Sequence, residues 1–150
     1  MTWSCKKFDE LTPYELYAIM QLRNQVFVVE QQCIFQDADN KDIDCYHVMC
    51  MIDHKLAAYA RIVPAGISYV ETSIGRVVTS PSARSKGIGN ILMQKTLETI
   101  YALYGKVPVK IGAQLYLKKF YESFAFKQTS DIYIEDDIQH IEMMLQHNEK

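Results

Sequence analysis

The 150-residue sequence has no long apolar run, no internal repeat and no low-complexity tract. Its longer hydrophobic runs, such as residues 48–52, fall far short of the roughly 20 residues that a membrane-crossing helix needs. With 49% hydrophobic and 23% charged residues, the composition excludes collagen-like, coiled-coil and disordered chains. The 4 prolines stand singly at apparent element boundaries. We therefore expect one soluble globular domain over residues 1–150, without a membrane partner.

The chain also lacks an excess of charge of one sign. Its 16 basic and 18 acidic residues are spread along the whole length and leave a formal net charge of −2. This balance provides no basic surface for a polyanion, so we expect no nucleic-acid partner. The amino terminus has no apolar stretch or small-residue cleavage site of the kind found in secretion signals, which favours a cytoplasmic location.

The 4 cysteines form no C-x-x-C pair. Isolated cysteines in a reducing compartment usually behave as small buried hydrophobic residues, so we expect no disulfide. A zinc site made from Cys45, His47, Cys50 and His54 is not expected either. Alternation along a strand would place Cys45 and His47 on one face and Cys50 on the other. We therefore expect no metal ion.

Two helices are predicted after a first strand. Thr12-Pro13-Tyr14-Glu15 is a capping box with proline at the first helical position, and it begins a helix that runs to about Asn24. A second helix is predicted over residues 26–35. The polar run 36–44 is expected to form a loop.

The rest of the chain alternates between strands and helices. Residues 46–52 and 56–63 are rich in β-branched and aromatic residues and flank a tight turn, which is typical of a hairpin. A long helix is expected to end at Gly105, and a shorter one covers residues 117–124. Further strands are predicted at 72–78, 109–113, 126–134 and 138–145. This order predicts an α/β fold with a mixed sheet.

The segment from Ile74 to Gly89 has the strongest functional signal, because a strand passes through a short polar turn directly into a helix. The first turn of a helix has unpaired N–H groups that bind anions, and glycines let a phosphate approach the backbone. Inside a helix, Gly87 and Gly89 would each cost about 1 kcal/mol relative to alanine. Arg84 and Lys86 add positive charge. The alternative is that the glycines serve tight packing and the two cations are solvated.

Two nucleotide-binding motifs are excluded in this segment. A dinucleotide fingerprint requires a third glycine where the chain has Leu92. A P-loop of the form G-x-x-x-x-G-K-[ST] does not occur. The expected phosphate ligand is therefore neither NAD nor ATP.

The same segment resembles the acetyl-CoA signature of the GNAT N-acetyltransferase superfamily. Arg84-x-x-Gly87-x-Gly89 follows the Val77-Val78 strand, and residues 120–126 are similar to the superfamily's Y-E-x-x-G-F helix end. Four further segments resemble its ElaA-like branch, namely residues 23–31, 60–62, 113–114 and 135–141. The resemblance covers nearly the whole chain. It implies a mostly antiparallel, twisted central sheet that splays between its fourth and fifth strands, with helices on both faces.

The chain departs from the family pattern at two places. Ala125 replaces the glycine before the final Phe of the helix-end motif, so this helix is expected to end without its usual left-handed residue or to shift slightly. In the tail, Asp137-Ile138-Gln139-His140 stands where the family has Gly-Ile-Pro-His.

The resemblance implies transfer of an acetyl group from acetyl-CoA, the cosubstrate, to a primary amine by direct attack in a ternary complex. A bulge is expected to expose the N–H of Val78 to the thioester oxygen, while the pantetheine arm pairs with the same strand and the pyrophosphate sits on residues 84–89. The implied cofactor-binding residues are Val77, Val78, Thr79, Arg84, Ser85, Lys86, Gly87, Ile88 and Gly89.

The resemblance also assigns catalytic residues. Tyr121 matches the superfamily's general acid, since a phenol stays protonated at neutral pH and donates to a departing thiolate. Its place on an apolar helical stripe is also typical of a core tyrosine. Glu30 and His47 are candidate bases, with surface and structural roles as alternatives. His140, in the tail, is a further candidate.

Acceptor binding is assigned by the same resemblance, with packing or surface roles as alternatives, to Phe27, Gln31, Arg61 and Gln114. The acceptor is expected to be a small-molecule or peptide amine, and the fold is compatible with a homodimer. The alternative function is a non-catalytic acyl-CoA-binding or regulatory interaction module on the same fold.

Overall fold

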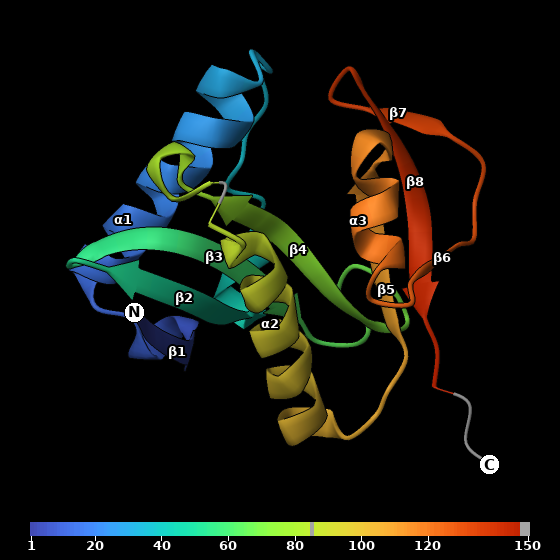
Figure 1. Ribbon diagram of the computed structural model, residues 1–150, viewed down its shortest axis with the longest axis horizontal. Helices are drawn as coiled ribbons and strands as arrows, with labels where there is room; N and C mark the ends of the chain where they lie inside the picture. The colour runs from blue at the N-terminus through green and yellow to red at the C-terminus, as the bar shows by residue number, and fades with distance from the viewer. Residues whose placement is uncertain (85, 148–150) are drawn as a thin grey trace.

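The computed structural model describes residues 1–84 and 86–147, and within these ranges the strands form one mixed sheet (Figure 1). Neighbouring strands follow the order β1-β2-β3-β4-β5-β8-β6, and β7 pairs with β8. All of these pairs are antiparallel except β4–β5, which is parallel. The strands are β1 (Thr2–Lys7), β2 (Tyr46–Ile52), β3 (Lys55–Val63), β4 (Thr72–Thr79), β5 (Val109–Gln114), β6 (Lys127–Gln128), β7 (Tyr133–Glu135) and β8 (Ile138–Leu145).

Helices cover both faces of the sheet, which confirms the predicted architecture. On one face, Ile19 and Leu22 of α1 (Pro13–Arg23) share a core cluster with Tyr59 of β3. On the other face, buried residues of α2 (Ile88–Tyr104) pack on Ala58 and Ile62 of the same strand, because successive side chains of a strand point to opposite faces. The remaining helical elements are α3 (Lys118–Glu122), the π-helix η2 (Asn24–Glu30) and the 3-10 turns η1 (Phe8–Glu10), η3 (Asp42–Asp44), η4 (Pro81–Ala83) and η5 (Leu115–Leu117).

The predicted capping box is confirmed, but the separate second helix is wrong. Thr12 Oγ1 accepts a hydrogen bond from the N–H of Glu15 at 3.1 Å, and the Glu15 carboxylate accepts one from the Thr12 N–H at 2.8 Å. η2 continues directly from α1 and ends at Glu30 instead of near residue 35. Its N–H groups bond to carbonyls five residues earlier, as in Gln31 to Val26 at 3.1 Å. Hydrophobic spacing alone does not distinguish such a wide turn from an α-helical one.

The single strand predicted over residues 126–134 is also wrong, because the structure has two short strands there, β6 and β7. Ser130 lies between them, and its side-chain oxygen accepts a hydrogen bond at 2.8 Å from the backbone N–H of Glu142 on β8. A side chain thus takes the place of a backbone carbonyl in the ladder. The chain bends away from β8 at this point and rejoins it at Tyr133.

β4 separates from β5 after only two residue pairs. Thr72 pairs with Val109 and Ser73 with Lys110, and Figure 1 shows the two parts of the sheet diverging beyond this point. On its other edge, β4 stays paired with β3, but one extra residue enters β4 between Gly75 and Val78. Arg76 in this bulge has a positive φ of 51°. Since a bulge bends its strand and increases the local twist, it directs β4 away from β5. The predicted splay is confirmed.

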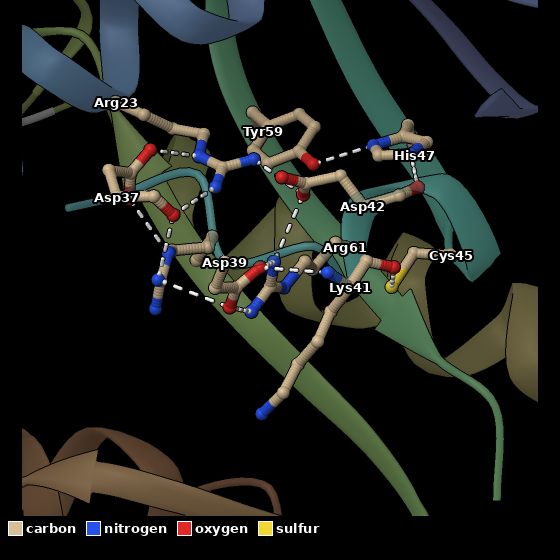
Figure 2. A network of polar contacts seen from close by, with 10 residues as sticks. Arg23, Asp37, Asp39, Lys41, Asp42, Cys45, His47, Tyr59 and Arg61 are labelled. Atoms are coloured by element: carbon tan, nitrogen blue, oxygen red, sulfur yellow. Dashed lines mark hydrogen bonds and ion pairs between the residues drawn. The ribbon is translucent and has the colours of Figure 1, made fainter. Parts of the chain in front are cut away.

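The loop over residues 36–44 is held against β3 and β4 by buried ion pairs, which we call the arginine–aspartate network (Figure 2). The fully buried Arg23 of α1 lies 2.7 Å from both Asp37 and Asp42. Asp42 also contacts Arg61 at 3.0 Å. Two further residues complete the network, Asp39 paired with Arg61 and Arg76 paired with Asp37. Three guanidinium groups therefore balance three carboxylates.

Ala125 keeps the left-handed conformation that the family's glycine would have, contrary to our expectation that the helix would end without it. Its φ is +72°. The N–H of Ala125 bonds to the carbonyl of Glu122 at 2.9 Å, and that of Phe126 bonds to the carbonyl of Tyr121 at 3.3 Å. These are the two hydrogen bonds of a Schellman motif, and they hold Ala125 in a conformation that its Cβ disfavours.

No helix within residues 1–84 and 86–147 is long and apolar enough to cross a membrane. Three of the four cysteines are buried as expected, whereas Cys5 is exposed.

We predict that Ala125→Gly stabilises the protein. Glycine adopts a positive φ without the steric cost of a Cβ, and the gain exceeds the added entropy of the unfolded chain. The midpoint of thermal unfolding should rise by about 1–4 °C. Ala102→Gly, at an exposed position in α2, is the matched control and should lower the midpoint by a similar amount. A lower midpoint in Ala125→Gly would contradict the strain argument.

The arginine–aspartate network predicts a large loss of stability in Asp42→Asn. Burial alone would raise the pKa of Asp42, but the hydrogen bonds and charges of Arg23 and Arg61 outweigh burial and lower it. The amide leaves both guanidinium groups short of a carboxylate, which should cost about 3–5 kcal/mol and lower the midpoint by about 10 °C. The exposed Asp44 serves as control, and Asp44→Asn should shift stability by less than about 0.5 kcal/mol.

The pairing of Asp42 with Arg23 and Arg61 also determines how the stability of the protein changes with pH. Because the pKa of Asp42 is lowered in the folded protein, its stabilisation is complete above the ordinary pKa of a carboxyl group and is lost as the pH falls. In acid, the difference in unfolding free energy between the wild type and Asp42→Asn should therefore shrink. A difference that stays constant down to pH 2.5 would contradict the assignment.

Candidate active site

A cavity of about 900 Å³ occupies the opening between β4 and β5, and we call it the cleft. It is bordered by η2, β4, the start of α2, β5, α3 and the β7–β8 hairpin. The cleft brings together most of the site residues that the sequence predicted, namely Phe27, Glu30, Gln31, Arg61, Val77, Val78, Thr79, Arg84, Gly89, Gln114 and Tyr121. Lys86, Gly87, Ile88 and His47 do not line it, and Ser85 lies outside the described residues.

The start of α2 has the features of an anion site. Gly87 is the N-cap residue with a φ of +70°, and no side chain among the described residues caps the helix. A Cβ on Gly89 would lie 3.8 Å from the Phe120 ring, which is an ordinary contact, so packing does not require glycine there. This favours ligand approach over the packing alternative for Gly89. Ile88 is buried in the core, so only its backbone is available to a ligand, and Lys86 is exposed.

The edge of β4 that faces the opening presents the amides of Val77 and Thr79. The N–H of Ser80 bonds to the carbonyl of Ala57 on β3 at 2.8 Å, and Val78 is paired with Tyr59 in the same register. Because N–H groups alternate along a strand, the Val78 N–H also points toward β3. In this register the amide that the sequence predicted to meet the thioester oxygen faces β3, and the amides on either side of it face the opening.

Arg84 joins the loop before α2 to the end of η2. Its guanidinium lies 2.7 Å from one carboxylate oxygen of Glu30 and donates to the other at 2.9 Å. This bond and the positive charge hold the pKa of Glu30 below its usual value. Arg84 also lies 3.4 Å from the carbonyl of Thr79, at the open edge of β4. Glu30 is therefore a weaker base than an unpaired carboxylate would be.

Residues 30–33, which we call the cross-cleft segment, also contact the far wall. The side-chain amides of Gln31 and Gln114 donate to each other, at 3.4 and 3.3 Å. The thiol of Cys33 donates to the carbonyl of Asp136 in the β7–β8 turn at 2.8 Å. With the Glu30–Arg84 pair, these contacts connect one short segment to both sides of the opening.

Tyr121 is both a core residue and a residue of the cleft. Its ring packs edge-on against both Phe120 and Phe126, with the ring centroids 5.2 and 6.0 Å apart. Its exposed fraction is 6%, and burial raises the pKa of its hydroxyl well above the usual value. The two interpretations of this tyrosine are therefore compatible. A phenol that keeps its proton is suited to donating it.

His47 does not reach the cleft, so its proposed role as a base is not supported by the structure. The ring is fully buried, with Nδ1 at 2.7 Å from the Tyr59 hydroxyl and Nε2 at 2.9 Å from the Asp42 carbonyl (Figure 2). Burial lowers the pKa of its imidazole. Both ring nitrogens serve the packing of the loop over residues 36–44, which is the structural alternative.

Arg61 lines the cleft, but carboxylates already occupy its guanidinium. Nη1 donates to Asp39 at 2.8 Å and to Asp42 at 3.0 Å. Burial alone would raise the pKa of Asp39, and Arg61 more than reverses this. These aspartates were not predicted as site residues, because residues 36–44 were expected only to form a polar loop. Their spacing in a polar run carried no signal, because the arginines that pair with them come from three other elements.

Comparison with known proteins agrees with this architecture. Residues 16–147 match the model of the acetyltransferase (GNAT) domain family. The protein ElaA of Escherichia coli is 42% identical over 143 residues, which is 94% of each chain, and its crystal structure superposes with a TM-score of 0.89. A UPF0039 protein of Schizosaccharomyces pombe is 41% identical over 94% of each chain.

A further solved structure extends this similarity. It is an acyl-CoA N-acyltransferase from Pseudomonas aeruginosa, which is 41% identical and superposes with a TM-score of 0.91 over 95% of this chain and 97% of that one. Sequence and structure therefore agree, and the chain belongs to the GNAT acetyltransferase family, in its ElaA-like branch.

Proposed function

We propose that this protein transfers an acetyl group from acetyl-CoA to a primary amine, with both substrates bound in the cleft at once. One observation carries the proposal. The uncapped start of α2, the unpaired edge of β4 and the protonated Tyr121 all border the same cavity. These three features meet the needs of the reaction, which are an anion site, donors for an oxyanion and an acid for the leaving thiolate.

The cofactor side of the cleft is built from backbone groups. The free N–H groups at the start of α2, where a Cβ on Gly87 would meet only open space, suit the pyrophosphate of CoA. Arg84 and Lys86 supply positive charge to it, and Arg84 keeps its contact with Glu30. The pantetheine arm adds to the open edge of β4 as a peptide strand would, through Val77 and Thr79.

The acetyl group lies at the bulge of β4 in this proposal. An N–H of β4 that points to the opening polarises the thioester carbonyl and stabilises the tetrahedral oxyanion. The amine attacks the carbonyl carbon, the C–S bond breaks, and Tyr121 gives its proton to the departing sulfur. The raised pKa of Tyr121 keeps its hydroxyl protonated at any assay pH near neutral.

The acceptor side lies under the cross-cleft segment. Phe27, Gln31 and Gln114 offer an apolar surface and two amides to the acceptor. We assign Arg61 an indirect part, because it fixes Asp39 and the loop over residues 36–44 that forms this wall. The similarity to a protein described as an acyl-CoA N-acyltransferase supports this choice over a module that only binds acyl-CoA.

Acetyl-CoA should stabilise the folded protein. At about a hundred times its dissociation constant, a ligand adds roughly 2.7 kcal/mol, which raises the thermal midpoint by about 5–10 °C for a chain of this size. Gly89→Leu, which places a bulky side chain beside the Phe120 ring in the lining of the cleft, should abolish the shift. Gln94→Leu, at an exposed position of the same helix, is the control and should keep it. Dephospho-CoA and ATP should shift the midpoint less. The absence of any shift with millimolar acetyl-CoA would refute the proposed function.

Tyr121→Phe should slow turnover by about 100-fold or more, because the thiolate then leaves without a proton donor. Release of CoA is measured with a panel of tyramine, spermidine and lysine amide, and the KM for acetyl-CoA should change little because the ring is retained. Tyr101→Phe, in α2 and away from the cleft, provides a matched control. Full turnover in Tyr121→Phe would mean that another group protonates the sulfur.

A further inference from the structure

We propose that His140 is the general base that takes the proton from the acceptor amine. This inference rests on the proposed function and adds a catalytic residue to it. His140 lies on β8 opposite Gln114 of β5, and its side chain lines the cleft. Only 7% of it is exposed, so it is held within the wall of the cavity and not on the outer surface. It is therefore placed on the acceptor side, next to the residues that receive the amine.

The contacts of the imidazole fix which nitrogen is free to act. Nδ1 lies 2.8 Å from the carbonyl oxygen of Ile138. A carbonyl can only accept a hydrogen bond, so Nδ1 must be the nitrogen that has the hydrogen. In the neutral ring, Nε2 then has the lone pair that a base requires. The ring is further held by Tyr133, which stacks on it with the two centroids 5.8 Å apart.

A carboxylate lies close to the nitrogen that would act as the base. Nε2 of His140 lies 3.7 Å from a carboxylate oxygen of Glu135, which is too long for a hydrogen bond but close enough for an ion pair. The neutral ring is therefore not blocked by this carboxylate. A carbonyl that orients the ring through Nδ1 and leaves Nε2 free is the arrangement that base catalysis by histidine uses.

The other two candidate bases lack this combination. His47 is fully buried, and both of its ring nitrogens contact protein groups. Glu30 is bound to Arg84 through both carboxylate oxygens. Among the candidates that the sequence suggested, His140 alone combines a place in the cleft with a nitrogen left free by the described residues.

The protons of the reaction balance with His140 and Tyr121 in these roles. Nε2 of His140 takes one proton from the ammonium form of the acceptor, and the neutral nitrogen forms a bond to the thioester carbon. Breaking of the C–S bond moves a proton from Tyr121 to sulfur, and the proton that the nitrogen loses on becoming an amide replaces it. The imidazolium releases its proton to solvent. The net products are the acetylated amine, CoA as a thiol and one proton.

Several other titratable groups lie on the elements around His140. They are Tyr133 and Glu135 of β7, Asp136 in the turn, Glu142 with its partner Lys110, Tyr69, and Cys33 of the cross-cleft segment. Burial raises the pKa of Tyr133 to about 12 and also raises that of Tyr69. These two phenols therefore keep their protons over an assay from pH 6 to 9. A change of activity with pH in this range must come from the titration of another group.

The test compares His140→Gln with the wild type over pH 6 to 9, using the most active amine of the panel. At pH 7 the variant should lose about 100-fold in kcat/KM for the amine. The loss should shrink as the pH rises, because the amine then supplies its own neutral fraction. Hydroxylamine, which is largely unprotonated at neutral pH, should react nearly as well with the variant as with the wild type. The thermal shift with acetyl-CoA should be unchanged.

Two further variants complete the experiment. His54→Asn, on the exposed β2–β3 turn, is the control and should leave the whole pH profile unchanged. Glu135→Gln, at an exposed position, keeps the imidazole and should therefore lower kcat/KM for the amine at pH 7 far less than His140→Gln does. An equal loss in the two variants would count against His140 as the base.

The outcomes separate this proposal from the proposed function. A wild type that binds acetyl-CoA but acetylates no amine overturns both. An active wild type with an equally active His140→Gln overturns only the role of His140. A loss in the variant that is the same at every pH, and the same with hydroxylamine, would show that His140 supports the structure of the site and does not act as a base. Loss of the acetyl-CoA shift in the variant would overturn the assignment as well.

Discussion

The separation of β4 from β5 is the constraint on which the rest of the structure depends. Two parallel residue pairs join the two parts of the sheet, and beyond them the facing edge of β4 has no strand partner within residues 1–84 and 86–147. Unpaired backbone groups are normally avoided inside a protein unless water or a ligand satisfies them. The fold therefore leaves one row of hydrogen-bonding groups for a ligand, and the bulge at Arg76 maintains it by bending β4 away.

Arg76 links this bulge to the buried charges. It is the left-handed residue of the bulge, and its side chain pairs with Asp37 and Asp39 of the loop over residues 36–44. The same aspartates pair with Arg23 of α1 and Arg61 of β3. One network thus connects the distorted strand, a helix and the loop that borders the cleft. Buried charges are costly to leave unpaired, so each member holds the others in place.

Much of the fold followed from local sequence signals. The capping box at Thr12, the β2–β3 hairpin and the helix that starts after Gly87 each depend on residues close together in the chain. The π-helical η2 and the division of one predicted strand into β6 and β7 did not follow, because hydrophobic spacing does not reveal a wide helical turn or a serine that replaces a carbonyl in a ladder. The family resemblance predicted a bulge in β4. It did not predict which backbone amides face the opening, because that depends on the register of β4 with β3.

For the site, the sequence by itself determined the glycine-rich helix start, the tyrosine at the end of α3 and the family, since these are encoded in contiguous motifs. Only the tertiary structure decided how the residues act together. Glu30 meets Arg84 from 54 residues away, and Gln31 meets Gln114 from 83. His47 and His140 both lie on strands with similar surroundings in sequence, yet one is sealed beneath a loop and the other opens to the cleft. The burial of a side chain depends on elements that are distant in the sequence, and a local sequence pattern therefore does not predict it.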